Sequence, residues 1–194
     1  MAGLISYLYL QAQTMITIIS GTNRQDSETE KVAAIIYDLV NTSSDEEVKL
    51  LVLTDLPLDF ISSDMYRPSG QHADITSIQN EFMLPADKFW FVFPEYNGGV
   101  PGILKLFLDA LSVRSLAETF RGKKACLTGI STGRAGNLRG LDHLTNILNY
   151  LQVIVYPNRL PISSISNLKD DDGVFKDRET LQVLNLQLKE FLAF

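Results

Sequence analysis

The sequence predicts a single α/β domain built on a doubly wound parallel sheet of five strands. Short apolar runs rich in β-branched residues alternate with longer segments whose apolar residues recur at helical spacing. Three of the loops that follow strands are rich in Gly, Ser, Thr, Asn and Arg, at residues 20–29, 94–102 and 131–140. Ligands of such sheets bind at the carboxyl ends of the strands, so these loops are the expected binding sites.

The strands are expected at five apolar runs, residues 15–20, 48–53, 88–93, 124–130 and 153–156. Helices are expected between them at residues 30–40, 74–84, 103–111, 138–151 and 179–191. A long irregular stretch, residues 54–70, follows the second strand, and stretches of this length are usually functional or disordered. Because no internal repeat or linker interrupts the pattern, residues 15–194 are expected to form one α/β domain.

Composition limits the classes of function. The chain has 194 residues, 45% of them hydrophobic, and a net charge of −6 without a block of Lys or Arg. This charge argues against nucleic acid and membrane surfaces as partners and favours small molecules. The single Cys126 lies in an apolar run and cannot form an internal disulfide, which fits a reducing cytoplasm.

Residues 1–14 are expected to be an accessory segment. Their apolar stretch, Leu4 to Leu10, is too short to span a bilayer and lacks the basic start of a signal peptide. Met15 directly precedes the first strand and is an alternative start of the protein. The sequence leaves both readings open.

The first loop, Ser20-Gly-Thr-Asn-Arg-Gln-Asp-Ser-Glu-Thr29, leads directly into the first helix. Free N–H groups at a helix start, hydroxyl donors and one guanidinium together suit a phosphate, with Thr22, Arg24 and Ser27 as side-chain ligands. The alternative is that Asp26 or Ser27 only caps the helix. The loop by itself is equally compatible with both, and it is neither a Walker loop nor a dinucleotide fingerprint.

The second loop, Pro94-Glu-Tyr-Asn-Gly-Gly-Val-Pro-Gly102, follows the aromatic third strand. Gly98 and Gly99 would let the backbone approach a flat ligand, and exposed N–H groups would bond to the edge of a heterocycle. Tyr96 would add an aromatic wall. Pro101 is also expected near the first position of the next helix, and the two roles are compatible.

The string from Pro94 to Ser112, PEYNGGVPGILKLFLDALS, resembles the signature of the NADPH-dependent FMN reductase family. This flavodoxin-like group includes azo-, chromate- and quinone-reducing flavoproteins. The matching positions are Pro94, Glu95, Tyr96, Asn97, Pro101, Gly102, Leu104, Lys105 and Asp109. The first loop resembles the family pattern Gly-Ser-x-Arg-x-x-Ser-x-Asn, except that Thr22 replaces Ser and Thr29 replaces Asn. The resemblance covers residues 15–157.

The resemblance implies a flavodoxin-like three-layer sandwich with strand order 2-1-3-4-5 and FMN as the cofactor, reduced by NADPH or NADH. It places the FMN phosphate on the first loop, the isoalloxazine on the second and the third loop beside the flavin. The cofactor-binding residues expected are Ser20, Thr22, Arg24, Ser27, Thr29, Pro94, Glu95, Tyr96, Asn97, Gly98, Ser131, Thr132, Gly133 and Arg134. For Arg134, a solvated position is the favoured alternative. No catalytic acid or nucleophile is expected, because the cofactor carries the reaction.

The implied activity is electron transfer from NAD(P)H through FMN to free flavin, a quinone, an azo compound or a metal oxyanion. The sequence chooses neither the acceptor nor the nicotinamide. An electron carrier without nicotinamide turnover is the alternative, which Arg24 and the PEYN string disfavour, and a flavin-free interaction protein is the third. The resemblance also implies a homodimer or a dimer of dimers, in which Phe60, Met65 and Tyr66 cover the partner or its flavin; packing within their own subunit is the equal alternative.

Metal binding is not expected. His72 and His143 lack metal-ligand spacing with Cys or carboxylates and are interpreted as structural or surface residues. The acidic runs at residues 45–47 and 170–172 lack the alternating oxygen ligands of a calcium loop and are interpreted as solvated turns.

Overall fold

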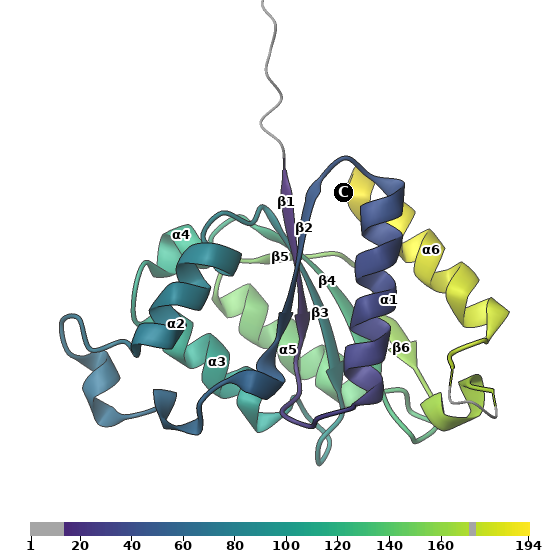
Figure 1. Ribbon diagram of the computed structural model, residues 1–194, viewed down its shortest axis with the longest axis horizontal. Coiled ribbons are helices and arrows are strands. Elements are labelled where there is room, and N and C mark those ends of the chain that lie inside the picture. Colours follow the sequence, from purple (N-terminus) through teal and green to yellow (C-terminus); the bar gives the residue numbers. More distant parts are fainter. Residues whose placement is uncertain (1–13, 171–173) are drawn as a thin grey trace, which may run out of the picture.

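The computed structural model describes residues 14–170 and 174–194, so the accessory segment at residues 1–13 and the acidic residues 171–172 lie outside the described part. A parallel sheet lies between two layers of helices (Figure 1). The strand order is β2 (Glu47–Val52), β1 (Met15–Ser20), β3 (Lys88–Pro94), β4 (Lys124–Ile130) and β5 (Ile154–Val155). All neighbouring strands are parallel, which confirms the predicted order 2-1-3-4-5.

The fifth position of the sheet differs from the prediction. The expected strand 153–156 is reduced to the two residues of β5, and β6 (Leu160–Ile162) pairs with the other half of β4. Ile154 aligns with Lys124, whereas Leu160 aligns with Thr128. Pro157 lies between the two short strands and has no N–H to donate to a ladder, which accounts for the interruption.

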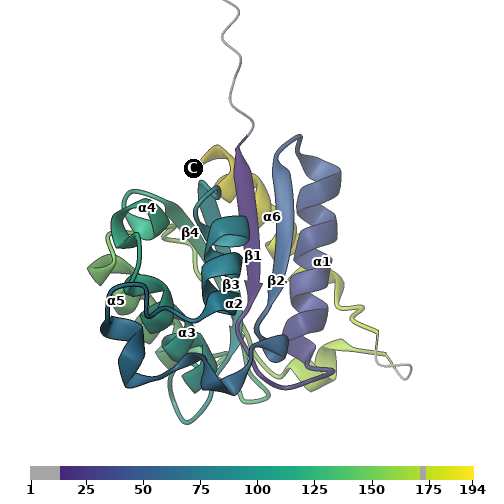
Figure 2. The same ribbon diagram turned by 60° about the vertical axis from the view of Figure 1, so that its left-hand side comes forward.

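The helices divide between the two faces of the sheet (Figure 2). One face packs against α1 (Glu28–Ser43) and α6 (Arg178–Ala193). The other face is covered by α2 (Ala73–Ile78), α3 (Gly102–Ser112), α4 (Leu116–Phe120) and α5 (Leu138–Tyr150). The central strand β3 supplies both cores, because side chains alternate along a strand: Phe89, Phe91 and Phe93 enter one core, and Trp90 and Val92 the other.

The connection between β2 and β3 departs most from the sequence-based expectation. Short 3-10 turns at Leu53–Asp55, Leu58–Phe60 and Ser63–Tyr66 occupy the predicted irregular stretch. The single helix predicted for residues 74–84 is α2 followed by a π-helical turn at Gln79–Met83. The buried Gln79 amide donates to the carbonyl of Leu111 at 3.0 Å and to the Thr119 hydroxyl at 2.7 Å. This side chain ties the turn to the ends of α3 and α4, and α4 was not predicted.

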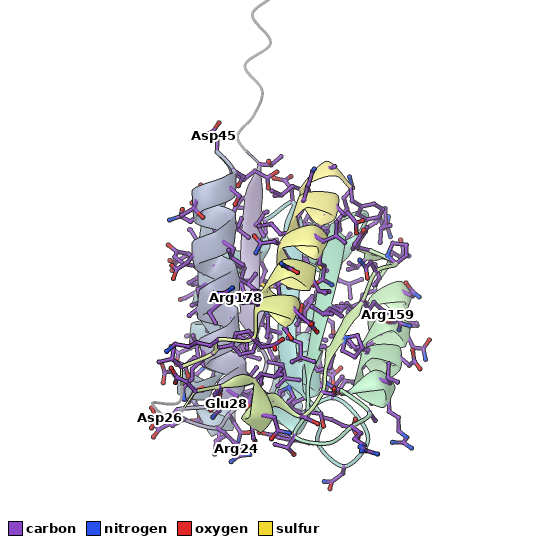
Figure 3. All side chains as sticks on the ribbon, turned by 90° about the vertical axis from the view of Figure 1, so that its right-hand side faces the viewer. Arg24, Asp26, Glu28, Asp45, Arg159 and Arg178 are labelled. Carbon is purple, nitrogen blue, oxygen red and sulfur yellow. The ribbon has the colours of Figure 1, made fainter. Side chains whose placement is uncertain are left out.

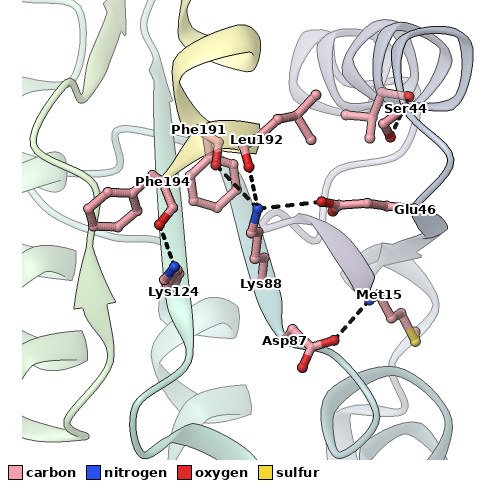
Figure 4. A network of polar contacts seen from close by, with 10 residues as sticks. Met15, Ser44, Glu46, Asp87, Lys88, Lys124, Phe191, Leu192 and Phe194 are labelled. Atoms are coloured by element: carbon pink, nitrogen blue, oxygen red, sulfur yellow. Dashed lines mark hydrogen bonds and ion pairs between the residues drawn. The ribbon is translucent and has the colours of Figure 1, made fainter. Parts of the chain in front are cut away.

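At the amino ends of the strands, the C-terminal turn of α6 is fastened to the sheet (Figure 4). The ammonium of Lys88, on β3, donates to the carbonyl of Leu192 at 2.8 Å and lies 3.5 Å from a carboxylate oxygen of Glu46. Lys124, on β4, donates to the carbonyl of Phe194. The ammoniums therefore complement the negative end of the α6 dipole, and this edge of the sheet is closed.

We expect Phe191→Ala to lower the free energy of unfolding by about 3–5 kcal/mol, measured by urea denaturation. Phe191 is fully buried, and its ring meets the Trp90 ring edge-on with centroids 5.6 Å apart. The control is Leu186→Ala on the same helix, because Leu186 is 52% exposed; its effect should stay within about 0.5 kcal/mol. Equal losses for the two variants would contradict the placement of α6.

Candidate cofactor site

The three polar loops meet at the carboxyl edge of the sheet, where the chain leaves β1, β3 and β4. The N–H of Gly21 donates to the carbonyl of Val92 at 2.8 Å, and the N–H of Glu95 donates to that of Ile130 at 3.1 Å. Figure 3 shows Arg24, Asp26 and Glu28 together at this end of α1, with Asp45 beyond the other end. The loops singled out in the sequence are therefore neighbours at the topological switch point between β1 and β3.

The first loop combines a helix cap with free donors. Ser27 is the N-cap of α1, and its hydroxyl oxygen accepts from the N–H of Glu30 at 3.1 Å. The capping alternative is thus what the structure shows, but a hydroxyl that accepts still has its proton to donate. Arg24 is exposed, and among the described residues its guanidinium has no ion pair. The α1 N-terminus and Arg24 together can hold an anion.

Thr22 and Thr29 are both buried, unlike the exposed residues 23–26 of the same loop. The Thr22 hydroxyl accepts from the N–H of Arg24 at 3.2 Å and lies 2.8 Å from the Tyr96 hydroxyl. This hydrogen bond joins the first loop to the second. Thr29 lies in the first turn of α1 with its side chain packed inside.

The second loop forms a tight reversal between Tyr96 and Gly99, whose N–H and carbonyl groups exchange two hydrogen bonds of 3.1 Å. Asn97 and Gly98 form its tip in the left-handed region, with φ of 51° and 77°. Asn and Gly are the residues that adopt this conformation at least cost. The tip is exposed, while Pro94 and Glu95 at the end of β3 are half-buried. The backbone N–H groups at the tip are therefore placed to contact a ligand.

The third loop is held mainly by backbone hydrogen bonds. Thr132, Gly133 and Arg134 are exposed, and the Ser131 hydroxyl accepts from the N–H of Gly133 at 3.0 Å. Backbone bonds from Ser131 to Ile162 and from Ile165 to Ser131 connect the loop to β6 and the turn after it. The exposure of Arg134 agrees with the solvated alternative.

Two α5 residues that we had not assigned to the site contact the second loop. The side chains of Arg139 and His143 lie beside Gly98 and Gly99, where an added Cβ atom would come within 3.6 Å and 3.0 Å of them, respectively. His143 was interpreted as structural or surface, and it is indeed exposed. The sequence feature that could have indicated a role for His143 in the site is its position in the helix that follows the third loop. The guanidinium of Arg139 adds a positive charge next to the turn.

Three buried polar atoms at this edge lack a hydrogen-bond partner among the described residues: the Ser20 hydroxyl oxygen, Oε2 of Glu95 and Oδ1 of Asn137. Leaving buried polar atoms unpaired is costly, so such atoms are expected where a ligand completes the structure. An isoalloxazine ring offers one N–H donor, and its phosphate tail accepts hydrogen bonds. The residues present, with an unpaired carboxylate oxygen, free backbone N–H groups and a guanidinium, fit FMN.

A cavity of about 930 Å³ lies between the loop after β2 and the end of α3. Met65 and Tyr66, which were expected to cover a partner or its flavin, line it, whereas no residue of the three loops does. Residues 14–170 and 174–194 contain no group of three or more His, Cys, Asp or Glu side chains able to hold a metal ion. Within the same residues, no helix is long and apolar enough to cross a membrane.

Comparisons with known proteins identify the family of the chain. The family model described as NADPH-dependent FMN reductase matches residues 14–166. The chain is 36% identical over 107 residues to an NAD(P)H-dependent FMN reductase of Pseudomonas aeruginosa, a match that covers 54% of this chain and 56% of that protein. It is 27% identical to the 2-hydroxy-1,4-benzoquinone reductase of a Burkholderia species, covering 92% of this chain and 94% of that protein.

A quinone reductase of Escherichia coli K12 is 28% identical, with 95% and 97% of the two chains covered. Among solved structures, the flavoenzyme FerB of Paracoccus denitrificans, an NAD(P)H:(acceptor) oxidoreductase, superposes with a TM-score of 0.75. That alignment covers 93% of this chain and 96% of the other, at 22% identity. An archaeal flavodoxin has a TM-score of 0.57 at 13% identity. Both structures share the flavodoxin-like fold.

We expect the ion pair between Glu28 and Lys169, 2.9 Å apart beside the first loop, to depend on pH. Partial burial acts to raise the pKa of Glu28, but hydrogen bonds from Lys169 and Lys31 outweigh it and lower that pKa. The pair therefore stabilises the fold above the ordinary pKa of 4.5 and loses its effect as the pH falls through the lowered value.

A double-mutant cycle with Glu28→Gln and Lys169→Met, followed by urea denaturation, should give a coupling of about 0.5–1 kcal/mol at neutral pH. In acid the coupling should vanish, because Glu28 is then protonated. A coupling that is the same in acid and at neutral pH would show that the two side chains interact in another way.

Proposed function

Because this chain belongs to the NADPH-dependent FMN reductase family, we propose that it passes electrons from NAD(P)H through bound FMN to a quinone. NAD(P)H-dependent flavin reduction is the activity of the family. The quinone is our choice of acceptor. The observation that carries this choice is that two relatives aligned over more than nine-tenths of both chains are quinone reductases.

The first loop would hold the phosphate of FMN. The α1 N-terminus supplies backbone N–H groups and the positive end of the helix dipole, and Ser27 and Arg24 add a hydroxyl and a guanidinium. Thr29 is buried in the first turn of α1 and would support the loop from below, whereas the unpaired hydroxyl of the buried Ser20 would be satisfied by the ligand. The site is thus an anion site that does not depend on an excess of basic residues in the chain.

The second and third loops would hold the isoalloxazine. Bound FMN supplies the redox chemistry, accepting electrons from NAD(P)H and delivering them to the acceptor. The tip at Asn97 and Gly98 directs backbone N–H groups outward, and such dipoles stabilise negative charge as it develops. Pro94, Glu95 and Tyr96 would orient the ring, and Ser131, Thr132, Gly133 and Arg134 would line its other side. No side chain of this set needs to act as an acid or a nucleophile.

The protein is also proposed to be a cytoplasmic homodimer or dimer of dimers. Leu58 and Tyr66, in the stretch after β2, are 80% and 73% exposed, and both side chains are therefore accessible to a partner. Phe60 and Met65 are buried within their own subunit, as the alternative interpretation expected, and only Tyr66 of the three remains free to cover a partner. The buried thiol of Cys126 is compatible with a reducing compartment.

Reconstitution with FMN tests the proposed function. We expect a bound flavin whose visible absorbance is lost on anaerobic addition of NADPH or NADH and returns on addition of 1,4-benzoquinone. Turnover with the quinone should exceed turnover with free FMN as acceptor by at least about tenfold, a difference of about 1.4 kcal/mol in the barrier. Flavin that binds but is not reduced would indicate an electron carrier, and failure to bind flavin would indicate an interaction protein.

A further inference from the structure

The hydrogen bond between the side chains of Thr22 and Tyr96 connects the second loop to the first. The backbone of Tyr96 belongs to the turn assigned to the isoalloxazine, whereas its hydroxyl lies 2.8 Å from the Thr22 hydroxyl in the loop assigned to the phosphate. One residue therefore reaches both ends of the proposed cofactor site. The sequence suggested only an aromatic wall for Tyr96 and a direct phosphate ligand for Thr22.

Burial determines which of the two hydroxyls donates the hydrogen bond and which accepts it. Each carries one proton, and one of the two protons is used in the bond between them. If Tyr96 donated to Thr22, the proton of Thr22 would have to find another acceptor, yet Thr22 is fully buried and its other bond, from the N–H of Arg24, uses a lone pair. A buried donor without an acceptor is costly. The favoured arrangement is donation from Thr22 to Tyr96, which frees the phenol proton.

We infer that the Tyr96 hydroxyl, oriented by the buried Thr22, donates a hydrogen bond to the phosphate group of FMN. Tyr96 is only half-buried, and its hydroxyl lies beside the first loop, so the proton left free can reach a ligand held there. A phenol that donates to a phosphate dianion makes a charge-assisted bond, which is stronger than one between neutral groups. Thr22 is then a positioning residue and not a direct ligand.

The inference rests on the proposed function and adds a basis for choosing FMN over riboflavin. Riboflavin has the same ring and ribityl chain but no phosphate. A contact to the phosphate changes the affinity for FMN alone, whereas loss of ring packing changes the affinities for both. The ratio of the two dissociation constants therefore separates the proposed role from a merely structural one.

The experiment measures the dissociation constants of FMN and riboflavin by quenching of flavin fluorescence for four proteins: wild type, Tyr96→Phe, Thr22→Val and the double variant. We expect Tyr96→Phe to weaken FMN binding at least about tenfold and riboflavin binding less than about twofold. Thr22→Val should lower the preference for FMN by a smaller factor. In the double variant it should add nothing to the effect of Tyr96→Phe, because it acts through the same hydroxyl.

Two further variants are controls. Thr22→Ser keeps the hydroxyl and should keep the wild-type preference. Tyr156→Phe removes a phenol hydroxyl that bonds to Glu190 at 2.6 Å, away from the three loops, and should leave the preference unchanged.

An unchanged preference in Tyr96→Phe, or an equal loss for both flavins, would overturn the inference. So would a full loss in Thr22→Val with none in Tyr96→Phe, since Thr22 would then be the direct ligand. If the wild type binds neither flavin, the proposed function itself fails, and with it the basis of this inference.

Discussion

The structure depends on the parallel pairing of β3 with both β1 and β4. Parallel strands place all their carboxyl ends at one edge, and the strand order reverses between β1 and β3, which is where the ligands of such sheets bind. Because Phe91 and Val92 fill opposite cores, β3 cannot shift by one residue without exchanging its two faces. The loops that follow β1, β3 and β4 are thus held in a fixed relation by strands that are themselves buried.

The amino and carboxyl ends of the strands differ in their contacts with the rest of the protein. At the amino edge, Lys88 and Lys124 join the strands to the end of α6, although Oε2 of Glu46, beside Lys88, is buried without a hydrogen-bond partner among the described residues. At the carboxyl edge, Glu95 keeps an unpaired buried oxygen and the turn at Gly98 presents its backbone outward. The amino edge therefore carries the contacts between the sheet and α6, whereas the carboxyl edge carries the exposed loops that suit a cofactor site.

The sequence was sufficient to predict the bounds of strands that are buried along their whole length. β1 and β4 have the predicted bounds, and β3 extends the prediction by one residue, because uninterrupted apolar runs of this length fit a strand buried on both faces. The sequence was insufficient to predict local structure that depends on a contact between residues far apart in the chain. The π-helical turn depends on the Gln79 amide reaching α3 and α4, and the division into β5 and β6 depends on how Pro157 meets the edge of β4. Similarly, the three site loops were predicted, but the contact of His143 with Gly99 and the bond from Thr22 to Tyr96 join segments that are far apart in the chain.

The central claim is that FMN binds at the carboxyl edge, between the loops after β1, β3 and β4. Amide hydrogen exchange of the protein with and without FMN tests this claim most directly, since it locates binding without relying on turnover. The account predicts slower exchange at residues 21–28, 95–99 and 131–136 when FMN is present. Protection confined to residues 65–77 and 113–114, beside the cavity at the end of α3, would contradict it.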